Sequence, residues 1–215
     1  MIVLALDTAA SGCYAAVYDA TAGRELARAG AEIGRGHAEQ LMGFLTDALE
    51  RAGLSLSAVD RFAVCVGPGS FTGIRVGVAA ARGLALACGK PAVGITTFAT
   101  LAAMADQGRG EPVMVLLDAK RDEVYGQPFG SDGQPAGGAF LLPLDEARAL
   151  AAGFGGRLVG TAGAALGLPV EEIGPADIGV MARLGVLAAV GEKPRPLYLR
   201  GPDAKPQLGF ALARA

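Results

Sequence analysis

The chain has 215 residues, enough for one large domain or two small ones, and either can bury a hydrophobic core. Apolar residues make up 52% of the sequence and charged residues 19%, and the mean hydropathy is +0.40. This balance indicates a compact protein with more apolar surface than one chain hides, which favours a protein partner. The net charge of −2 and the isoelectric point near 5.5 argue against a nucleic-acid-binding surface on the isolated chain.

The cysteine content predicts a reducing environment. Cys13, Cys65 and Cys88 are odd in number and widely separated, which is not the pattern of a disulfide framework. The apolar run at the N-terminus lacks a basic region and is interrupted at Asp7, so we do not expect a signal peptide. These features together predict a cytoplasmic protein with reduced cysteines in its core.

A long apolar region, residues 76–104, could in principle enter a membrane. It is interrupted by Arg82, Lys90 and Pro91, whereas a membrane span needs about 20 continuous apolar residues. We therefore expect no membrane association.

The first half of the chain reads as three strands, a helix, a strand, a helix, a strand and a helix. The predicted strands cover residues 2–6, 13–18, 24–31, 62–66 and 92–95, and the predicted helices cover 37–52, the segment after the Gly-rich turn up to 89, and 96–104. This order is that of the ribonuclease-H-like fold, an α/β fold.

The second half repeats part of this pattern after a polar, Gly-rich stretch at 106–111. Strands are predicted at 113–117, 123–129, near 140 and at 157–159, and helices at 144–152 and 178–190. Each half opens with an apolar strand that ends in an aspartate, Asp7 or Asp118, which suggests a duplicated fold. The predicted division is a subdomain at 1–108, a second at 109–192, and a Pro-rich tail at 193–215 that lies along the surface.

The most informative stretch covers residues 62–94 and reads FAVCVGPGSFTGIRVGVAAARGLALACGKPAVG. A buried strand stops at Gly67-Pro68-Gly69, and an apolar segment of helical length follows directly. Either Ser70 or Thr72 is expected to cap this helix. A stripe of mostly small residues recurs along it at spacings of three and four, namely Gly73, Gly77, Ala80, Leu84 and Ala87, and small residues allow another backbone to come close.

Three interpretations of this glycine turn can be compared. The spacing Gly67-x-Gly69-x3-Gly73 is similar to a dinucleotide-binding fingerprint, but that fingerprint needs an acid about 20 residues on, and no acid occurs between Arg61 and Met104. A phosphate-binding P-loop is excluded because Gly89-Lys90 precedes a proline and lies at the wrong end of the helix. The remaining interpretation is a strand–helix packing joint, with a possible role as an interface.

Asp7 and Asp118 are the only paired carboxylates whose positions follow a structural logic. In actin-like ATPases and sugar kinases such acids act through Mg²⁺ beside glycine loops that hold phosphates. Here Asp7 is followed by Thr-Ala-Ala and Asp118 by Ala-Lys-Arg, so the glycines are missing. We interpret both acids as relics of a phosphate site, with an active ATP site as the alternative.

No other residue gives a strong catalytic signal. His37 is the only histidine, so it cannot supply the His pair of a typical catalytic metal site, and no G-x-S-x-G motif accompanies it. At the start of a helix it is expected to be a surface or capping residue. Arg75 and Arg82 could hold an anion, although on an apolar helix they more often pair with an acid nearby. We predict no cofactor and no metal.

Several segments together resemble the TsaB family, the accessory proteins of bacterial tRNA threonylcarbamoyladenosine synthesis. The resemblance rests on five segments: LALDT at 4–8, HAEQL at 37–41, GPGSFTGIRVG at 67–77, DAKRDEVY at 118–125, and PLYLR at 196–200. They span nearly the whole chain, and the segment at 67–77 is long and specific.

This resemblance implies an actin-like ATPase fold, that is, a duplicated ribonuclease-H-like fold whose two subdomains have mixed sheets flanked by helices. It also implies a non-catalytic relative of the transferase TsaD, which carries a His-x3-His metal pair that a single His37 cannot reproduce. The expected partners are a TsaD-type transferase, as a heterodimer, and a TsaE-type ATPase that joins the pair. The isolated chain is expected to be a homodimer and to meet tRNA only through the complex.

The partner surface is expected on the two helices of the first half. The residues assigned to it are His37, Leu41, Leu45, Gly73, Arg75, Gly77, Ala80 and Leu84. If the small-residue stripe meets a partner helix, Gly77→Leu should leave the fold intact and weaken association. If the stripe faces the sheet, the same substitution should unfold the protein.

Two other function classes are compatible with the sequence. One is an active small-molecule kinase or carbamoyl transferase of the actin-like ATPase superfamily, which would turn over ATP alone. The other is a homodimer with no specific partner.

Overall fold

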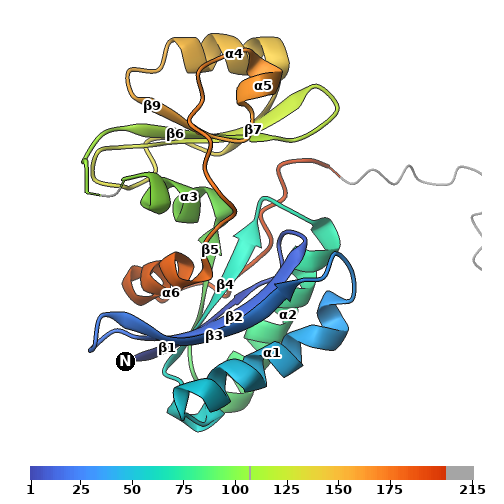
Figure 1. The fold of residues 1–215 in the computed structure, drawn as a ribbon, viewed down its shortest axis with the longest axis vertical. Helices are drawn as coiled ribbons and strands as arrows, with labels where there is room; N and C mark the ends of the chain where they lie inside the picture. The colour runs from blue at the N-terminus through green and yellow to red at the C-terminus, as the bar shows by residue number, and fades with distance from the viewer. Residues whose placement is uncertain (107, 202–215) are drawn as a thin grey trace, which may run out of the picture.

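The computed structural model describes residues 1–106 and 108–201, and it contains two β-sheets with helices between and around them (Figure 1). The first sheet has the strand order β3-β2-β1-β4-β5. Its strands are β1 (Ile2–Asp7), β2 (Gly12–Asp19), β3 (Arg24–Glu32), β4 (Arg61–Gly67) and β5 (Ala92–Thr96). β1, β2 and β3 pair antiparallel, whereas β4 and β5 continue the sheet in parallel with β1.

The central strands of this sheet are apolar because both of their faces are covered. Val3, Leu4, Ala5 and Leu6 of β1 have no exposed surface, as expected for strands that read as continuous hydrophobic runs. β3 is the edge strand and is largely exposed or half-buried. The first core is therefore centred on β1 and β4.

Helices α1 (His37–Ala52) and α2 (Phe71–Cys88) cover one face of the first sheet, and α6 (Ile178–Leu187) covers the other (Figure 1). Two neighbouring residues of β4 show that these helices lie on different faces of the sheet. A Cβ atom on Gly77 of α2 would meet the side chain of Val64, and one on Gly185 of α6 would meet that of Ala63. Because successive strand residues point to opposite faces, α2 and α6 must lie on opposite sides of β4.

The predicted helix boundaries hold closely for α1 and α2. α1 covers the predicted range and ends at Gly53, whose φ of 66° is left-handed and favours glycine. Of the two capping candidates, Ser70 is the cap of α2, since its Oγ accepts a hydrogen bond of 3.2 Å from the Gly73 N–H. The short 3₁₀ turn η1 (Leu56–Ala58) was not predicted.

The second sheet has the order β8-β7-β6-β9 and is smaller. It consists of β6 (Val113–Asp118), β7 (Glu123–Phe129), β8 (Phe140–Pro143) and β9 (Arg157–Gly160). α4 (Leu144–Ala152) and α5 (Gly163–Leu166) pack on its outer face with a core of their own, and the four-residue α5 was not predicted. α3 (Thr97–Asp106) lies between the two sheets and shares the core on the inner face of this one.

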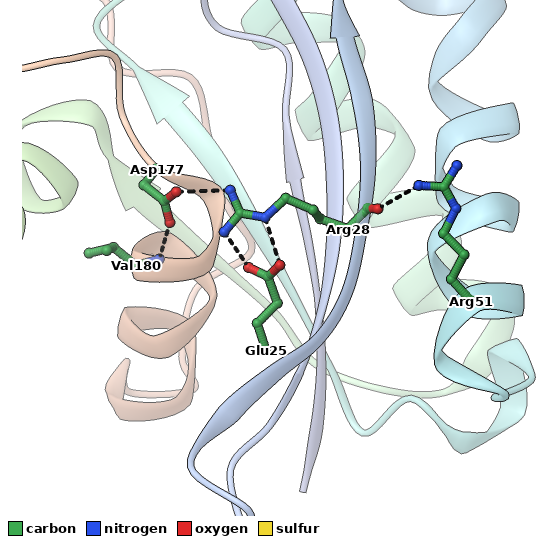
Figure 2. A network of polar contacts seen from close by, with 5 residues as sticks. All are labelled: Glu25, Arg28, Arg51, Asp177 and Val180. Atoms are coloured by element: carbon green, nitrogen blue, oxygen red, sulfur yellow. Dashed lines mark hydrogen bonds and ion pairs between the residues drawn. The ribbon is translucent and has the colours of Figure 1, made fainter.

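α6 is held in place by a polar network around Arg28 (Figure 2). The Arg28 guanidinium donates to both carboxylate oxygens of Glu25, at 2.6 and 2.7 Å, and to Asp177 at 2.9 Å. Asp177 also caps α6 by accepting a hydrogen bond of 3.0 Å from the Val180 N–H. Arg51 of α1 donates to the Arg28 carbonyl oxygen. The edge strand β3 thus connects the helices of both faces.

α6 departs from a simple division of the chain. Its residues fall within the range 109–192 that was assigned to a second subdomain, yet it packs on the first sheet against β1, β2 and β4. It also ends at Leu187, three residues earlier than predicted, because Arg61 donates hydrogen bonds to the carbonyl oxygens at its end and the backbone at Ala188 is extended. The boundaries at 108/109 and 192/193 stay predictions.

Cys13 and Cys65 are buried and Cys88 is half-buried, and all three are free thiols. Within the described residues α2 is long and apolar enough to cross a membrane, but a single helix of this kind is weak evidence because core helices pass the same test. Of the predicted tail, residues 193–201 run past α2 and β6–β7 with Pro194 buried, and 202–215 lie outside the described residues.

Candidate functional site

A cleft lies at the carboxyl end of β1, where an active relative of the fold would hold phosphates. Its volume is about 410 Å³. The lining includes the buried Asp7, the polar side chains Tyr14, Glu32, Thr97 and Thr161, and apolar residues such as Leu101 of α3, Leu117 of β6 and Ile173. Asp118 does not line it, so the cleft does not unite the two acids that the sequence paired.

Asp7 is held by its own turn. Its Oδ1 accepts a hydrogen bond of 2.8 Å from the Ala9 N–H. Burial raises the pKa of the Asp7 carboxyl above its ordinary value, although the hydrogen bonds from Ala9 and Cys65 oppose this shift. A carboxyl that is costly to ionise is a poor ligand for Mg²⁺, which binds carboxylate anions.

Asp118 is engaged differently. Its Oδ1 accepts the Lys120 N–H at 2.7 Å, and its Oδ2 pairs with Lys120 Nζ at 2.6 Å. These contacts with Lys120 lower the pKa of Asp118. Lys120, Arg121 and Asp122 all have positive φ, of 61°, 58° and 58°, so this turn has a left-handed backbone in which non-glycine residues are uncommon. The ammonium group of Lys120 thus pairs with the Asp118 carboxylate.

The glycines of the turn before α2 bring the helix against the end of β1. A Cβ atom on Gly69 would overlap the Ala9 carbonyl oxygen, and one on Gly73 would overlap that of Thr8. The Ser70 N–H donates to the Ala9 carbonyl oxygen at 2.6 Å. The glycine turn before α2 therefore packs against the turn that follows Asp7. It is a strand–helix packing joint, which was the third interpretation of its sequence.

The eight residues assigned to a partner surface do not share one face. Leu41 and Leu45 are buried in the first core, and so are Gly73 and Gly77, which face β1 and β4. These four residues are therefore not on the surface of the chain. For Gly73 and Gly77 the reason is that α2 is apolar on both faces, so its periodicity does not select one. Ala80 and Leu84 are half-buried against the same core. Arg75 is exposed.

His37 is half-buried at the first position of α1. Its Nε2 lies 3.1 Å from the Ala10 carbonyl oxygen, in the turn after β1. His37 therefore fastens α1 to this turn. It is not the cap of α1, because Gly36 holds that position and no side chain caps the helix.

The outer face of α1 and α2 carries the exposed small and apolar residues of the two helices. We call it the α1/α2 outer face and define it by Ala38, Met42, Gly43, Phe71, Ala79 and Gly83, all exposed. Gly43 and Gly83 lie in helix interiors, where glycine costs about 1 kcal/mol relative to alanine. A Cβ atom at either position would meet nothing within 4 Å. Packing within the chain does not explain these two glycines.

An aromatic cluster at the start of α2 was missed by the sequence analysis. The Arg75 guanidinium lies 3.6 Å from the centre of the Phe71 ring, and its Nε donates to Tyr198 Oη at 2.6 Å. The rings of Phe71 and Tyr198 are 5.1 Å apart. The spacing of Phe71 and Arg75, four residues along one helix, is a signal that could have indicated the contact. Tyr198 could not have been placed, since it lies 123 residues further on.

No group of three or more His, Cys, Asp or Glu side chains in the described part of the chain is arranged to hold a metal ion. Of the two acids that the sequence paired, Asp7 is buried and Asp118 is paired with Lys120.

The chain matches one protein-family model and several curated relatives. The family model described as tRNA N6-adenosine threonylcarbamoyltransferase matches residues 31–139, just over half of the chain. The TsaB protein of Escherichia coli is 34% identical over 134 residues, which cover 61% of this chain and 56% of that protein. The chain thus spans about half the length of this curated relative. An uncharacterised protein of Mycobacterium tuberculosis is 33% identical over 211 residues, covering 95% of this chain and 94% of the other.

Solved structures agree with these sequence matches. YeaZ from Pseudomonas aeruginosa superposes with a TM-score of 0.77 at 29% identity, covering 92% of this chain and 99% of that one. A second Pseudomonas aeruginosa structure, of a protein with similarity to peptidase YeaZ, gives 0.79 at 30%, with 93% and 99% covered. The ethanolamine utilisation protein EutJ, at 0.50 and 14%, shows the fold alone.

The expected fold class, an actin-like α/β fold with mixed sheets flanked by helices, is confirmed by these structures. Sequence relatives, the family model and the YeaZ structures all agree, and the chain belongs to the TsaB/YeaZ family.

Proposed function

We propose that this protein is a non-catalytic subunit needed for the biosynthesis of threonylcarbamoyladenosine in tRNA. The relatives' names supply the pathway, since TsaB proteins are named for this biosynthesis and the matching family model for the transferase itself. The protein acts in the cytoplasm as a heterodimer with a TsaD-type transferase, and the pair recruits a TsaE-type ATPase. Alone it forms a homodimer, and it meets tRNA only within the complex.

The observation that carries this proposal is the α1/α2 outer face. Its exposed helix-interior glycines, Gly43 and Gly83, have no packing role inside the chain, and small residues allow two helix backbones to approach closely. Met42, next to Gly43, and Phe71, at the start of α2, are 48% and 46% exposed, so they offer apolar anchors for a partner. This face replaces the inward-facing stripe at Gly73 and Gly77.

The non-catalytic role is supported by the state of the two acids. Asp7 is buried and Asp118 is paired with Lys120, and neither is followed by the glycines that a phosphate loop needs. We expect the isolated chain to show neither micromolar affinity for ATP in calorimetry nor turnover with Mg²⁺. Steady hydrolysis that Asp7→Ala abolishes would support the kinase alternative instead.

The partner surface is tested by Met42→Asp in a co-purification with the transferase. Burying an unpaired charge in an apolar contact should weaken association by about a hundredfold or more, and tRNA modification in cells should be lost. Leu187→Asp is the matched control, because Leu187 is 75% exposed on α6, on the opposite face of the sheet. If both variants co-purify as the wild type does, the α1/α2 outer face is not the interface.

A further inference from the structure

A second surface feature lies at the far end of α2, where the helix meets the segment that follows α6. We call it the α2 C-terminal groove. Its volume is about 480 Å³, its floor contains Ala85, Pro91 and Ala92, and its sides carry Leu86, Val190 and three cations. The cleft beside Asp7 and the aromatic cluster around Arg75 share none of these residues.

Both walls of the groove are fixed by the fold. On one side, Arg61 Nη1 donates to the carbonyl oxygens of Gly185, Val186 and Ala188, at 2.8, 3.0 and 2.9 Å. These bonds set the point at which the chain leaves α6. On the other side, Gly89 ends α2 with a φ of 62°, and the Lys90 N–H donates to the Ala85 carbonyl oxygen at 2.9 Å. Because these segments are already held in place, binding a ligand costs little conformational entropy at this site.

The charge of the groove has one sign. Arg82, Lys90 and Lys193 line it, and no Asp or Glu does. Lys90 is partly balanced by Asp60, 3.4 Å away. Among the described residues, no acid forms an ion pair with Arg82 or Lys193. Glu192, the residue before Lys193, instead lies 3.9 Å from Arg195. Cations near a helix C-terminus can serve the helix dipole, but Lys193 lies outside any helix.

The apolar part of the groove is unusually open to solvent. Leu86 is 81% exposed and Val190 is 55% exposed, and both line the groove. Two large exposed apolar side chains favour a ligand with apolar side chains of its own. The three cations of the lining favour carboxylates in the same ligand.

We infer that the α2 C-terminal groove binds a segment of a partner protein that carries apolar side chains flanked by aspartate or glutamate. This assignment goes beyond the proposed function, and one lining residue of the groove, Gly83, also belongs to the α1/α2 outer face. An anionic membrane fits less well, because the chain as a whole has a net charge of −2, which opposes adsorption to anionic lipid.

The test uses the full chain and a fluorescent synthetic peptide in which Leu and Phe alternate with Asp and Glu. Fluorescence anisotropy should show binding that weakens several-fold between about 50 and 300 mM salt, as screening requires. The double variant Arg82→Glu/Lys193→Glu should weaken it about tenfold or more, and Leu86→Ser by about tenfold. Arg183→Glu, an exposed arginine on α6 outside the lining, should leave it unchanged.

Three outcomes would overturn the inference. The first is no binding of the acidic peptide at millimolar concentration, or equal binding of a peptide in which lysines replace the acids. The second is binding that Arg183→Glu weakens as much as the double variant does. The third is stronger binding to phosphatidylserine vesicles, or complete displacement of the peptide by stoichiometric decanoate, which would assign the groove to lipid or to a small amphiphile.

Discussion

Thr8 Oγ1 donates a hydrogen bond of 2.7 Å to the carbonyl oxygen of Gly73, and this bond joins the end of β1 to the first turn of α2. The Thr8 carbonyl oxygen in turn lies where a Cβ atom of residue 73 would be. The two backbones are therefore in direct contact beside Asp7. This contact fixes the start of α2 against the turn that lines the cleft.

Gly77→Leu is expected to destabilise the protein. A Cβ atom at this position would lie 2.5 Å from Thr8 Oγ1 and 3.3 Å from Val64 Cγ2, so leucine overpacks the core and displaces the Thr8–Gly73 bond. The free energy of unfolding should fall by about 3 kcal/mol or more, which denaturant titration measures. This result is the opposite of the one expected if the small-residue stripe of α2 faced a partner, because the variant would then stay folded. An unchanged midpoint would show that α2 turns its other face inward.

Gly83→Leu is the matched substitution on the α1/α2 outer face. A Cβ atom there meets nothing within 4 Å, and leucine is a better helix former than glycine, so stability should rise by about 0.5–1 kcal/mol. Association with the transferase should weaken by about ten- to a hundredfold if helices meet closely at this position. Both quantities come from one preparation, by thermal melting and by titration with the partner. A folded variant with wild-type affinity would contradict this part of the interface.

Asp7→Asn is expected to leave the protein folded and functional. The asparagine Oδ1 can still accept the Ala9 N–H, and the cost of ionising a buried carboxyl disappears, so stability at pH 7 should lie within about 1 kcal/mol of the wild type or above it.

The pH dependence of stability gives a second measurement for Asp7→Asn. Burial raises the pKa of Asp7 above 3.8, so the native state holds this proton more tightly than the unfolded state. Wild-type stability should therefore lose a contribution as pH rises from about 4 through the raised pKa, and the variant should not show this loss. A variant that folds but no longer supports tRNA modification would restore a catalytic role for Asp7.

Asp177→Ala should lower stability by about 1–2 kcal/mol, because it removes both the cap of α6 and the bond to Arg28. Burial would raise the pKa of Asp177, but hydrogen bonds from Arg28 and the Val180 N–H outweigh it and lower the pKa. A carboxylate whose pKa is lowered in the folded state stabilises the fold at pH values above its ordinary pKa, near 3.8. This stabilisation is lost as the pH falls through the lowered pKa. The difference between wild type and variant should thus disappear in acid.

Asp145→Ala serves as the control for this measurement. Asp145 pairs with Arg148 at 3.1 Å, but its side chain is 94% exposed, so its removal should change the unfolding free energy little. Equal losses for the two aspartates would mean that Asp177 contributes no more than an ordinary surface charge.

Most strands and helices followed from the sequence because their patterns are local. The range of α1, from His37 to Ala52, was predicted in full, since the apolar period is regular and Gly53 stops it. β7 (Glu123–Phe129) and α4 (Leu144–Ala152) were also predicted in full. α5 was missed because four residues carry no period, and α6 was predicted too long because Arg61, distant in sequence, sets its end.

The orientation of α2 could not be predicted for a different reason. Small residues lie on both of its faces, with Gly73 and Gly77 inward and Ala79 and Gly83 outward. Its apolar period therefore identifies a helix without identifying the buried side. The contact with Thr8 determines which side of α2 is buried, and that contact joins residues 65 positions apart in the sequence. The interpretation of Asp7 as a relic rests on missing glycines, which are a local feature, and it stays a prediction.

The return of α6 to the first sheet has a consequence for how the protein is made. The ribosome releases β1 to β5 first, and the helix that covers their second face emerges only after the whole second sheet. Until then, the side of β4 that bears Ala63 is without α6, its permanent cover. A chain interrupted before residue 178 would expose this apolar surface to its neighbours, so premature termination late in the gene should yield aggregates instead of a smaller working protein.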